Sequence, residues 1–383
     1  MSLIYLDNAA TTPIDPRVTE AMLPWIGDNF GNPSSVHETG RKAKVMLEDT
    51  RDLFAEFIEA RPSEIYFTSG GTEANNFAIK GSAFYNLGKK DHIITTTIEH
   101  SAVIDTVEYL KIRFGVNVTY LRNNKYGEID LKELKDSVTD STFLVSVMHS
   151  NNELGVINDI SSIAALLKDT GIMLHTDMVQ SLGKVKFSIE ETGVNFASFS
   201  GHKIYGPKGL GVLYIKKDSP IDKFIHGGKQ ERDRRGGTEN ISAIAGFKKA
   251  IELLNAEMDS DIKKTSELRN ILLAELNSQF SDKIIVNSAK EGGVFLPNIV
   301  SISFNPKTTK IDPDTLLIKL DMKGIAVSSG SACTSGSVQP SHVLKAIGYD
   351  DSTARSSIRI SFGRFNTESD IEGLIKGLKE IFS

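Results

Sequence analysis

The chain alternates short apolar runs with longer stretches in which apolar residues recur every three or four positions. The short runs are rich in Ile, Val, Phe and Thr, a composition typical of strands that are buried on both faces of a sheet. Because helical stretches separate these runs, the pattern predicts an α/β fold with a mainly parallel sheet and right-handed crossovers. Strands are expected at Ile65–Thr68, His92–Thr96, Phe143–Met148, Met173–Thr176 and Gly211–Ile215.

A helical signal precedes the first of these strands. A serine just before it is expected to cap the helix, because its hydroxyl can accept a hydrogen bond from a free backbone N–H of the first turn. The expected cap is Ser34 or Ser35, and the apolar positions at helical spacing are Ala43, Leu47, Phe54, Phe57 and Ile58.

The pattern changes near Asn255, where a charged helical stretch is followed by short, separated strands. This change predicts a smaller α+β domain. We expect a large domain over residues 13–254, and a small domain that combines residues 1–12 with residues 255–383. The expected elements of the small domain are a helix at Met258–Phe280, strands at Lys283–Val286, Val300–Phe304, Ile325–Ser328 and Ser357–Ser361, and a closing helix at Glu368–Phe382.

Composition narrows the class of protein. The 383 residues are 40% hydrophobic and 24% charged, with a net charge of −5, which is ordinary for a soluble globular protein. No basic stripe points to nucleic acid as a partner, and no apolar run approaches the roughly 20 residues that span a bilayer. The segment Met1–Asp7 lacks the basic and apolar regions of a signal peptide. Together with the single cysteine, these features favour a cytoplasmic location.

The one cysteine, Cys333, lies in the run Ser328–Ser337 among small, polar residues. Buried structural cysteines usually have apolar neighbours, so this position is typical of a mobile, reactive thiol. Taken alone, an incidental exposed thiol explains it better. One cysteine cannot form a multi-cysteine zinc site, and none of the eight histidines lies in an HExxH pattern, so no catalytic metal is expected.

A glycine-rich segment, Thr68–Asn76, follows a predicted strand and opens a helical stretch. Glycine lets the backbone approach a ligand closely, and the free N–H groups of a helix N-terminus attract phosphate. Gly71 and Thr72 are therefore candidate phosphate ligands. The segment is not a Walker A loop, and a simple turn with a helix cap explains it about as well.

Candidate functional residues lie at two further strand ends. Asp177 could hold a protonated heterocycle nitrogen, although it could equally cap a helix or pair with an arginine. Lys203 could form an imine with an aldehyde if its pKa is lowered, and Ser200 and His202 beside it could bind phosphate. A lone lysine is usually a solvated charge. A phosphate loop, an acid and a lysine at successive strand ends are, however, the three anchors that pyridoxal 5'-phosphate needs.

Two other residues could complete such a site. His100, at the end of a predicted strand, could stack on a ring or transfer protons, although a lone histidine is more often structural. Arg359 lies in the apolar strand Ser357–Ser361, and a buried arginine calls for a carboxylate. That carboxylate could belong to a substrate or to a structural ion pair.

With these motifs assembled, the chain resembles the NifS/IscS-type cysteine desulfurases, which are pyridoxal-phosphate enzymes of the aspartate-aminotransferase fold. The resemblance runs nearly end to end and implies a large domain with a mainly parallel sheet and a smaller α+β C-terminal domain. Beyond the sites above, it rests on Tyr5–Pro13, Gly31–Ser35, Asn151–Gly155 and Arg235–Asn240. Met178, after Asp177, departs from the small residue common in the family, so the packing under the ring could differ.

The resemblance also implies roles for individual residues. Lys203 matches the imine-forming lysine, Asp177 the partner of the ring nitrogen, and His100 the ring-stacking acid and base. Cys333 matches the nucleophile that receives sulfur. Gln180 matches the hydrogen-bond partner of the ring hydroxyl, and Asn152 matches a contact to cofactor and substrate. Arg359 with Asn32 matches the group that binds the substrate carboxylate. The implied phosphate cradle consists of Gly71, Thr72, Ser200 and His202, completed by Thr238 of a second subunit.

The implied reaction is the conversion of L-cysteine to L-alanine, with sulfur held on Cys333 as a persulfide. The implied partners are a second copy of the chain and a sulfur acceptor for iron–sulfur cluster assembly, tRNA thiolation or a thio-cofactor. A selenocysteine lyase, an aminotransferase on the same fold, and a non-enzymatic subunit remain as alternatives. The cysteine loop disfavours a transaminase, which needs no thiol, and the intact lysine, acid and cysteine disfavour a degenerate subunit.

Overall fold

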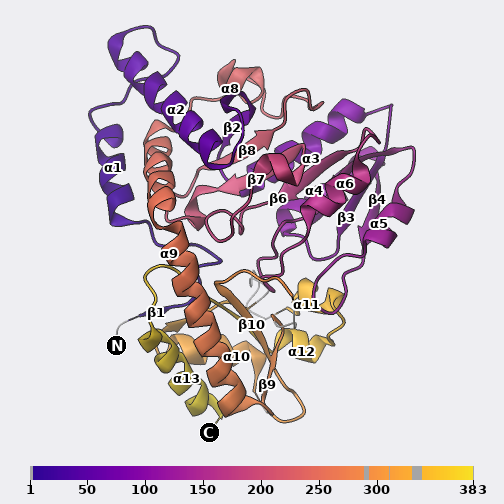
Figure 1. The fold of residues 1–383 in the computed structure, drawn as a ribbon, viewed down its shortest axis with the longest axis vertical. Helices are drawn as coiled ribbons and strands as arrows, with labels where there is room; N and C mark the ends of the chain where they lie inside the picture. The colour runs from indigo at the N-terminus through magenta and orange to yellow at the C-terminus, as the bar shows by residue number, and fades with distance from the viewer. Residues whose placement is uncertain (1–2, 289–292, 310, 330–338, 383) are drawn as a thin grey trace.

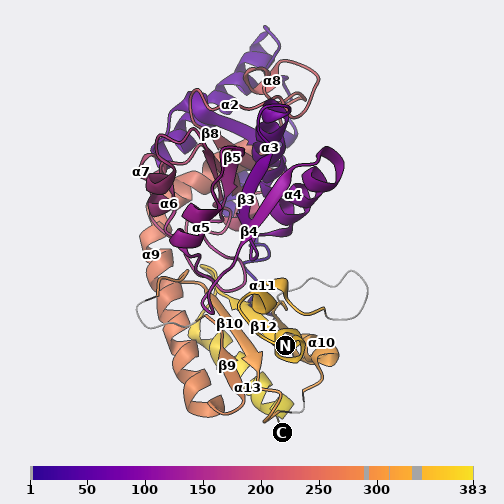
Figure 2. The same cartoon turned by 90° about the vertical axis from the view of Figure 1, so that its right-hand side faces the viewer.

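The computed structural model describes residues 3–288, 293–309, 311–329 and 339–382. Figures 1 and 2 show a large lobe and a smaller lobe, with the long helix α9 running through both. Cys333 lies outside the described residues, so the prediction for this residue rests on the sequence alone.

A seven-stranded sheet in the order β2-β8-β7-β6-β5-β3-β4 forms the centre of the large lobe. All its neighbouring strands are parallel except β8, which runs antiparallel to both β2 and β7. Six strands therefore share one direction, and their carboxyl ends meet at one edge. The strands are β2 Ile65–Thr68, β3 His92–Thr96, β4 Asn117–Leu121, β5 Thr142–Ser146, β6 Met173–Asp177, β7 Phe196–Ser200 and β8 Gly211–Ile215.

Helices cover both faces of this sheet, because successive residues of its strands point to opposite sides. Ile93 and Leu144 pack in a cluster with helices α3 and α4, whereas Ile94 and Val145 belong to the larger cluster that includes α2 and the first half of α9. The helices of this lobe are α1 Pro16–Ile26, α2 Glu38–Phe57, η1 Pro62–Glu64, α3 Gly71–Asn86, α4 Ser101–Phe114, α5 Leu131–Ser137, α6 Ile160–Leu167, α7 Ile189–Thr192, η2 Gly201–Lys203 and α8 Gln230–Asp233.

The small lobe is built around an antiparallel sheet in the order β12-β10-β9 and the parallel pair β1-β11. Its apolar cluster combines the C-terminal half of α9 with these strands and α13. Strand β1 comes from the N-terminus, so both ends of the chain meet here (Figure 1). The elements are β1 Ile4–Tyr5, β9 Ile284–Val286, β10 Ile299–Phe304, α10 Pro313–Asp321, β11 Ile325–Ala326, α11 His342–Ala346, α12 Asp351–Arg355, β12 Ser357–Ser361 and α13 Glu368–Phe382.

Helix α9, Ile241–Phe280, is longer than the stretch predicted from Met258. Its first half buries residues in the large lobe, including Leu254, and its second half buries Leu268 and Leu272 in the small lobe. The predicted division of the chain at residues 254 and 255 falls inside this continuous helix and stays a prediction. No helix of the described residues is long and apolar enough to cross a membrane.

One local prediction was wrong, and some elements were missed. Helix α2 is capped by His37, whose ring accepts a hydrogen bond from the backbone N–H of Gly40 at 3.3 Å, and not by Ser34 or Ser35. Helix α1 was missed because Pro24 interrupts its pattern. Strand β4 was missed because it lies at the sheet edge and is only partly buried.

Candidate active site

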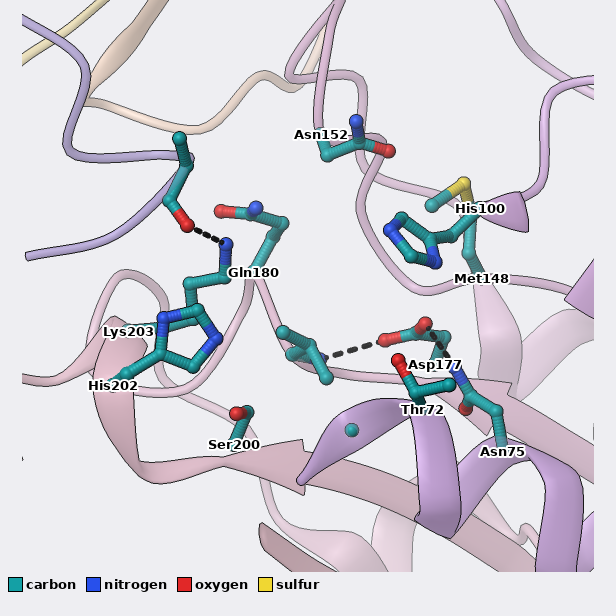
Figure 3. A pocket seen from close by; sticks show the side chains of 13 residues that line it. Thr72, Asn75, His100, Met148, Asn152, Asp177, Gln180, Ser200, His202 and Lys203 are labelled. Atoms are coloured by element: carbon teal, nitrogen blue, oxygen red, sulfur yellow. Dashed lines mark hydrogen bonds between the residues drawn. The ribbon is translucent and has the colours of Figure 1, made fainter. Parts of the chain in front are cut away.

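A cavity of about 250 Å³ lies at the carboxyl edge of the large sheet (Figure 3). The loops that follow β2, β3, β5, β6 and β7 all contribute to its wall, as expected for a parallel sheet. The cavity is lined by Ala10, Gly71, Thr72, Asn75, His100, Met148, Asn152, Asp177, Val179, Gln180, Ser200, His202 and Lys203. Nine of the residues predicted from sequence therefore share one space.

Lys203 ends the short helix η2, directly after β7. Its Nζ donates to the carbonyl oxygens of Ala9 at 2.6 Å and Ala10 at 2.7 Å. Burial and the nearby guanidinium of Arg359 lower the pKa of Lys203 to about 8. The amine is therefore partly uncharged near neutral pH, the form that attacks an aldehyde.

Asp177 ends β6 and is 6% exposed. Its Oδ2 accepts a hydrogen bond from Asn75 Nδ2 at 2.6 Å, and its Oδ1 accepts one from the backbone N–H of Val179 at 2.9 Å (Figure 3). These two donors stabilise the buried carboxylate and fix its orientation. Each oxygen can still accept a further hydrogen bond, which suits a protonated ring nitrogen.

The N-terminus of α3 forms another wall. The helix begins at Gly71 without a side-chain cap, so its first N–H groups remain suited to an anion. A Cβ at Gly71 would lie 2.7 Å from Val179 Cγ2, so only glycine lets the helix start this close to the end of β6. Thr72 adds a hydroxyl to the same wall.

Ser200 and His202 line the cavity on the side of Lys203 (Figure 3). His202 Nδ1 lies 3.1 Å from Thr11 Oγ1. Burial, with the charges of Lys203 and Lys208, lowers the pKa of His202 to about 4, so the imidazole is neutral at pH 7 and offers one N–H donor. This set of hydroxyl, imidazole and helix N–H donors fits a phosphate group.

Three further predicted residues, His100, Gln180 and Asn152, also line the cavity. His100 caps α4, and its Nδ1 accepts the Ala102 N–H at 3.0 Å, so in the neutral ring the proton is on Nε2. Gln180 Nε2 donates to the carbonyl oxygen of Ala9 at 2.9 Å. Asn152 is half-buried beside them.

Arg359 does not line the cavity but adjoins it through Asn152. Its Nη1 donates to the carbonyl oxygen of Asn152 at 2.9 Å, and its Nη2 pairs with Asp7 Oδ1 at 2.9 Å. The side chain is buried, and its Nε has no hydrogen-bond partner among the described residues. Arg359 is therefore held in place with one donor still available.

The structure does not bring two other predicted residues into the cavity. Asn32 is exposed in the loop before α2, where its Oδ1 accepts the Ser34 N–H at 2.9 Å. Thr238 is exposed between α8 and α9. Met178 is fully buried in the apolar cluster under the sheet, so its size does not alter the cavity wall.

Some residues of the site were missed by sequence reasoning. Asn75 lies one helical turn after Thr72, a spacing that could have placed it on the same face of α3. Glu99, just before His100, is fully buried, and burial raises its pKa to about 8. Its Oε1 accepts the Met148 N–H at 2.8 Å, whereas its Oε2 has no partner among the described residues. No sequence signal distinguishes this acid from an exposed one.

Taken together, the residues fit pyridoxal 5'-phosphate: a lysine with a lowered pKa, an anchored acid, an imidazole, and a set of donors suited to phosphate. The match depends on the chemistry of the donors and on the close approach at Gly71. These residues would hold the cofactor, and Lys203 would be the group that reacts with its aldehyde.

Comparisons with known proteins agree with this geometry. The family model described as aminotransferase class-V matches residues 4–374. The cysteine desulfurase IscS of Dictyoglomus turgidum is 43% identical over 378 residues, covering 99% of this chain and 94% of that protein. A solved structure of a NifS-like protein has a TM-score of 0.91 at 38% identity and covers 100% of this chain and 99% of its own. The structure of SspA in complex with cysteine has a TM-score of 0.81 at 35% identity, and the match covers 95% of this chain and 99% of the SspA chain.

Proposed function

The chain belongs to the class-V aminotransferase family, and from that premise we propose that it is a cysteine desulfurase that converts L-cysteine to L-alanine and transfers the sulfur to Cys333. Pyridoxal 5'-phosphate is the cofactor of this class of enzyme. The observation that carries the proposal is the meeting of Lys203, Asp177 and the N-terminus of α3 in one cavity. The relatives named as cysteine desulfurases, and the neighbour in complex with cysteine, support L-cysteine as the substrate.

When bound, the cofactor supplies a ring that stabilises negative charge at the Cα of the substrate. Asp177 would hydrogen-bond the protonated ring nitrogen, because its two donors fix the orientation of the carboxylate and leave each oxygen able to accept a further hydrogen bond. Gln180 would hydrogen-bond the ring hydroxyl, and His100 would stack on the ring with its Nε2 proton available for transfer.

Lys203 would move the proton at the substrate Cα, since its lowered pKa leaves part of the amine uncharged. Arg359 would bind the substrate carboxylate through the Nε that has no partner among the described residues, together with the Nη groups released from the backbone or from Asp7. Asn152 would orient the cofactor and the substrate, because it lines the cavity and its carbonyl accepts a hydrogen bond from Arg359.

The sulfur step uses the Cys333 thiolate as nucleophile. A sulfur–sulfur bond forms as the Cβ–S bond of the substrate breaks, and the electron pair of that bond stays with carbon. The carbon takes a proton and leaves as alanine, while Cys333 becomes a persulfide. No outside oxidant or reductant is needed for this step.

The persulfide must then pass to an acceptor. We propose a protein of iron–sulfur cluster assembly or of tRNA thiolation in a reducing, cytoplasmic setting, where a single working thiol stays reduced. Capture of acceptors by the persulfidated enzyme, compared with the same protein after reduction, would identify the acceptor.

We also propose that the enzyme is a homodimer. Thr238 is exposed and does not line the cavity of its own chain, which supports a role at the phosphate of a second subunit. Light scattering of the holoenzyme measures the state directly. A monomer with fully bound cofactor would contradict this arrangement.

The central test follows the visible spectrum of the holoenzyme during addition of L-cysteine, with an assay for alanine in the same sample. We expect the cofactor band to shift and alanine to form. Cys333→Ser should keep the band and lose sulfide release by at least ~10³-fold in the presence of a thiol reductant, because the nucleophile is gone.

Other outcomes would redirect the proposal. A keto acid product would indicate an aminotransferase, and a response only to selenocysteine would indicate a selenocysteine lyase. Normal sulfide release by Cys333→Ser would remove the nucleophile assignment. The absence of any cofactor band after addition of pyridoxal phosphate would contradict the whole proposal.

A further inference from the structure

A second lysine lies directly behind Lys203. Lys184 follows β6 and is 9% exposed. Its Nζ donates a hydrogen bond to the backbone carbonyl oxygen of Lys203 at 3.0 Å. Lys184 does not line the cavity, so it reaches the reacting groups only through Lys203.

The turn that carries Lys203 is held by hydrogen bonds to its backbone carbonyl groups. The carbonyl of Gly201 accepts the N–H groups of Ile204 at 3.2 Å and Gly206 at 3.1 Å. The carbonyl of His202 accepts the Thr12 hydroxyl at 2.9 Å. The carbonyl of Lys203 accepts the ammonium of Lys184, so this last group of the turn is held by a cation.

Lys184 has no carboxylate within ion-pairing distance among the described residues. Its Nζ lies 5.6 Å from the centre of the Tyr205 ring, and the guanidinium of Arg364 lies 4.2 Å from the same ring. Arg364 pairs with Asp261 at 2.7 Å. The ring of Tyr205 therefore lies near two buried cations, and within the part of the chain that the structure describes only Arg364 has a direct anionic partner.

The Lys184 ammonium is costly to bury without a counter-ion. The pKa of Lys184 is lowered to about 8: burial lowers it most, Asp261 opposes this change, and Arg364 lowers it by a smaller amount. The charged groups that face Lys184 are thus Lys203 from η2, Asp261 from α9 and Arg364 after β12, with Tyr205 as a neutral ring. The pKa of Lys203 is lowered chiefly by burial and then by Arg359, whereas Asp177 and Asp7 raise it. Lys184 also lowers it, by the smallest amount of these groups.

We propose that Lys184 is a positioning residue for Lys203. Its ammonium holds the carbonyl of the turn, and its positive charge favours the uncharged, nucleophilic form of the Lys203 amine. The inference rests on the proposed function, in which Lys203 reacts with the aldehyde of pyridoxal phosphate. It adds a residue that touches neither cofactor nor substrate.

The test measures the rate at which apoenzyme captures pyridoxal phosphate, followed by absorbance across a pH series. The rate should rise with pH as the Lys203 amine loses its proton. In Lys184→Met, the midpoint of this rise should move upward by about half to one pH unit, because one like charge near Lys203 is removed. Lys184→Gln, which keeps a donor but not the charge, should show the same shift with a smaller loss of melting temperature.

The matched control is Lys186→Met, which removes the same charge two residues away. Lys186 is exposed and pairs with Asp259 at 2.8 Å. Its midpoint should stay at the wild-type value. If both Lys184 variants lower the melting temperature and leave the midpoint unchanged, Lys184 is only structural and the proposal is overturned.

Failure of the cofactor assignment in the proposed function would look different. Wild-type apoenzyme would then show no capture of pyridoxal phosphate at any pH, whereas a change of reaction, such as a keto acid product, would leave this test valid. If Lys184→Met does not fold, the midpoint of Lys184→Gln decides alone: an upward shift supports the proposal, and an unchanged midpoint contradicts it.

Discussion

The two halves of the active site are built in different ways. The cofactor half belongs to the large sheet, where Asp177 and Lys203 lie at the ends of neighbouring strands and are held by contacts from Asn75 and the backbone. The proposed substrate half comes from the small lobe, where Arg359 pairs with Asp7, a residue 352 positions away. In the proposed cofactor half, the groups are held by neutral backbone and amide partners, whereas in the proposed substrate half Arg359 would exchange an internal ion pair for the substrate.

This difference has an energetic meaning. In the cofactor half the charged groups are oriented before the cofactor binds, so little reorganisation is needed when charge develops. In the proposed substrate half, a substrate carboxylate would compete with Asp7 for Arg359, and the gain in binding free energy would be only the difference between the two ion pairs. We therefore expect changes in the cofactor half to lower kcat and changes in the substrate half to alter KM.

The largest effect should come from Asp177→Asn. The amide keeps the shape and can still accept the Val179 N–H, but it removes the charge that holds the ring nitrogen protonated. We expect kcat to fall by about 10²- to 10³-fold, as when one preorganised electrostatic contact to developing charge is lost. Steady-state kinetics with L-cysteine, with the melting temperature as a check on folding, measures this. A kcat within about threefold of wild type would break the comparison.

A smaller effect is expected from Arg359→Gln. Loss of a charged hydrogen bond to the substrate carboxylate should lower kcat/KM by about 10- to 100-fold, mainly through KM. Steady-state kinetics over a wide range of L-cysteine separates KM from kcat. An equal loss in kcat with no change in KM would mean that Arg359 acts on the cofactor half instead.

Asp7→Asn is the matched variant for the same ion pair. Because it releases Arg359 from its internal partner, we expect KM to fall by about two- to fivefold, the range of a partly exposed ion pair. A rise in KM like that of Arg359→Gln would show that Asp7 positions the arginine and does not compete with the substrate.

The smallest effect on turnover should come from Glu99→Gln, which changes stability instead. The unfolded chain releases the Glu99 proton near pH 4.5, whereas the folded protein keeps it up to about pH 8. The folded state therefore binds more protons between these values, and Glu99 lowers stability as the pH rises through this window.

Glu99→Gln removes the pH dependence of the unfolding free energy that Glu99 causes, because glutamine carries no titratable proton. Its unfolding free energy relative to wild type should increase by about 1 kcal/mol for each pH unit within this window. Urea unfolding at several pH values measures the difference, with Glu56→Gln on the exposed face of α2 as control. If the difference in unfolding free energy between Glu99→Gln and wild type does not change with pH, Glu99 is ionised in the folded protein at neutral pH.

Much of the fold could be predicted because the signals are local. Strands β2, β3, β8 and β12, and helix α13, have the predicted bounds, since short runs buried on both faces and a strong apolar stripe are visible in sequence. The edge strand β4 and the proline-containing helix α1 were missed because their patterns are weak. The start of α9 was missed because its first half is buried by tertiary packing.

The sequence by itself determined that an acid, a lysine and a glycine-rich helix start lie at strand ends, and parallel topology brings such ends to one edge. Only the tertiary structure decided which groups hold them. Asn75 holds Asp177, Lys184 holds the turn of Lys203, and Asp7 occupies Arg359. These partners come from separate segments, and their hydrogen bonds and charges act through space, so no local pattern records them.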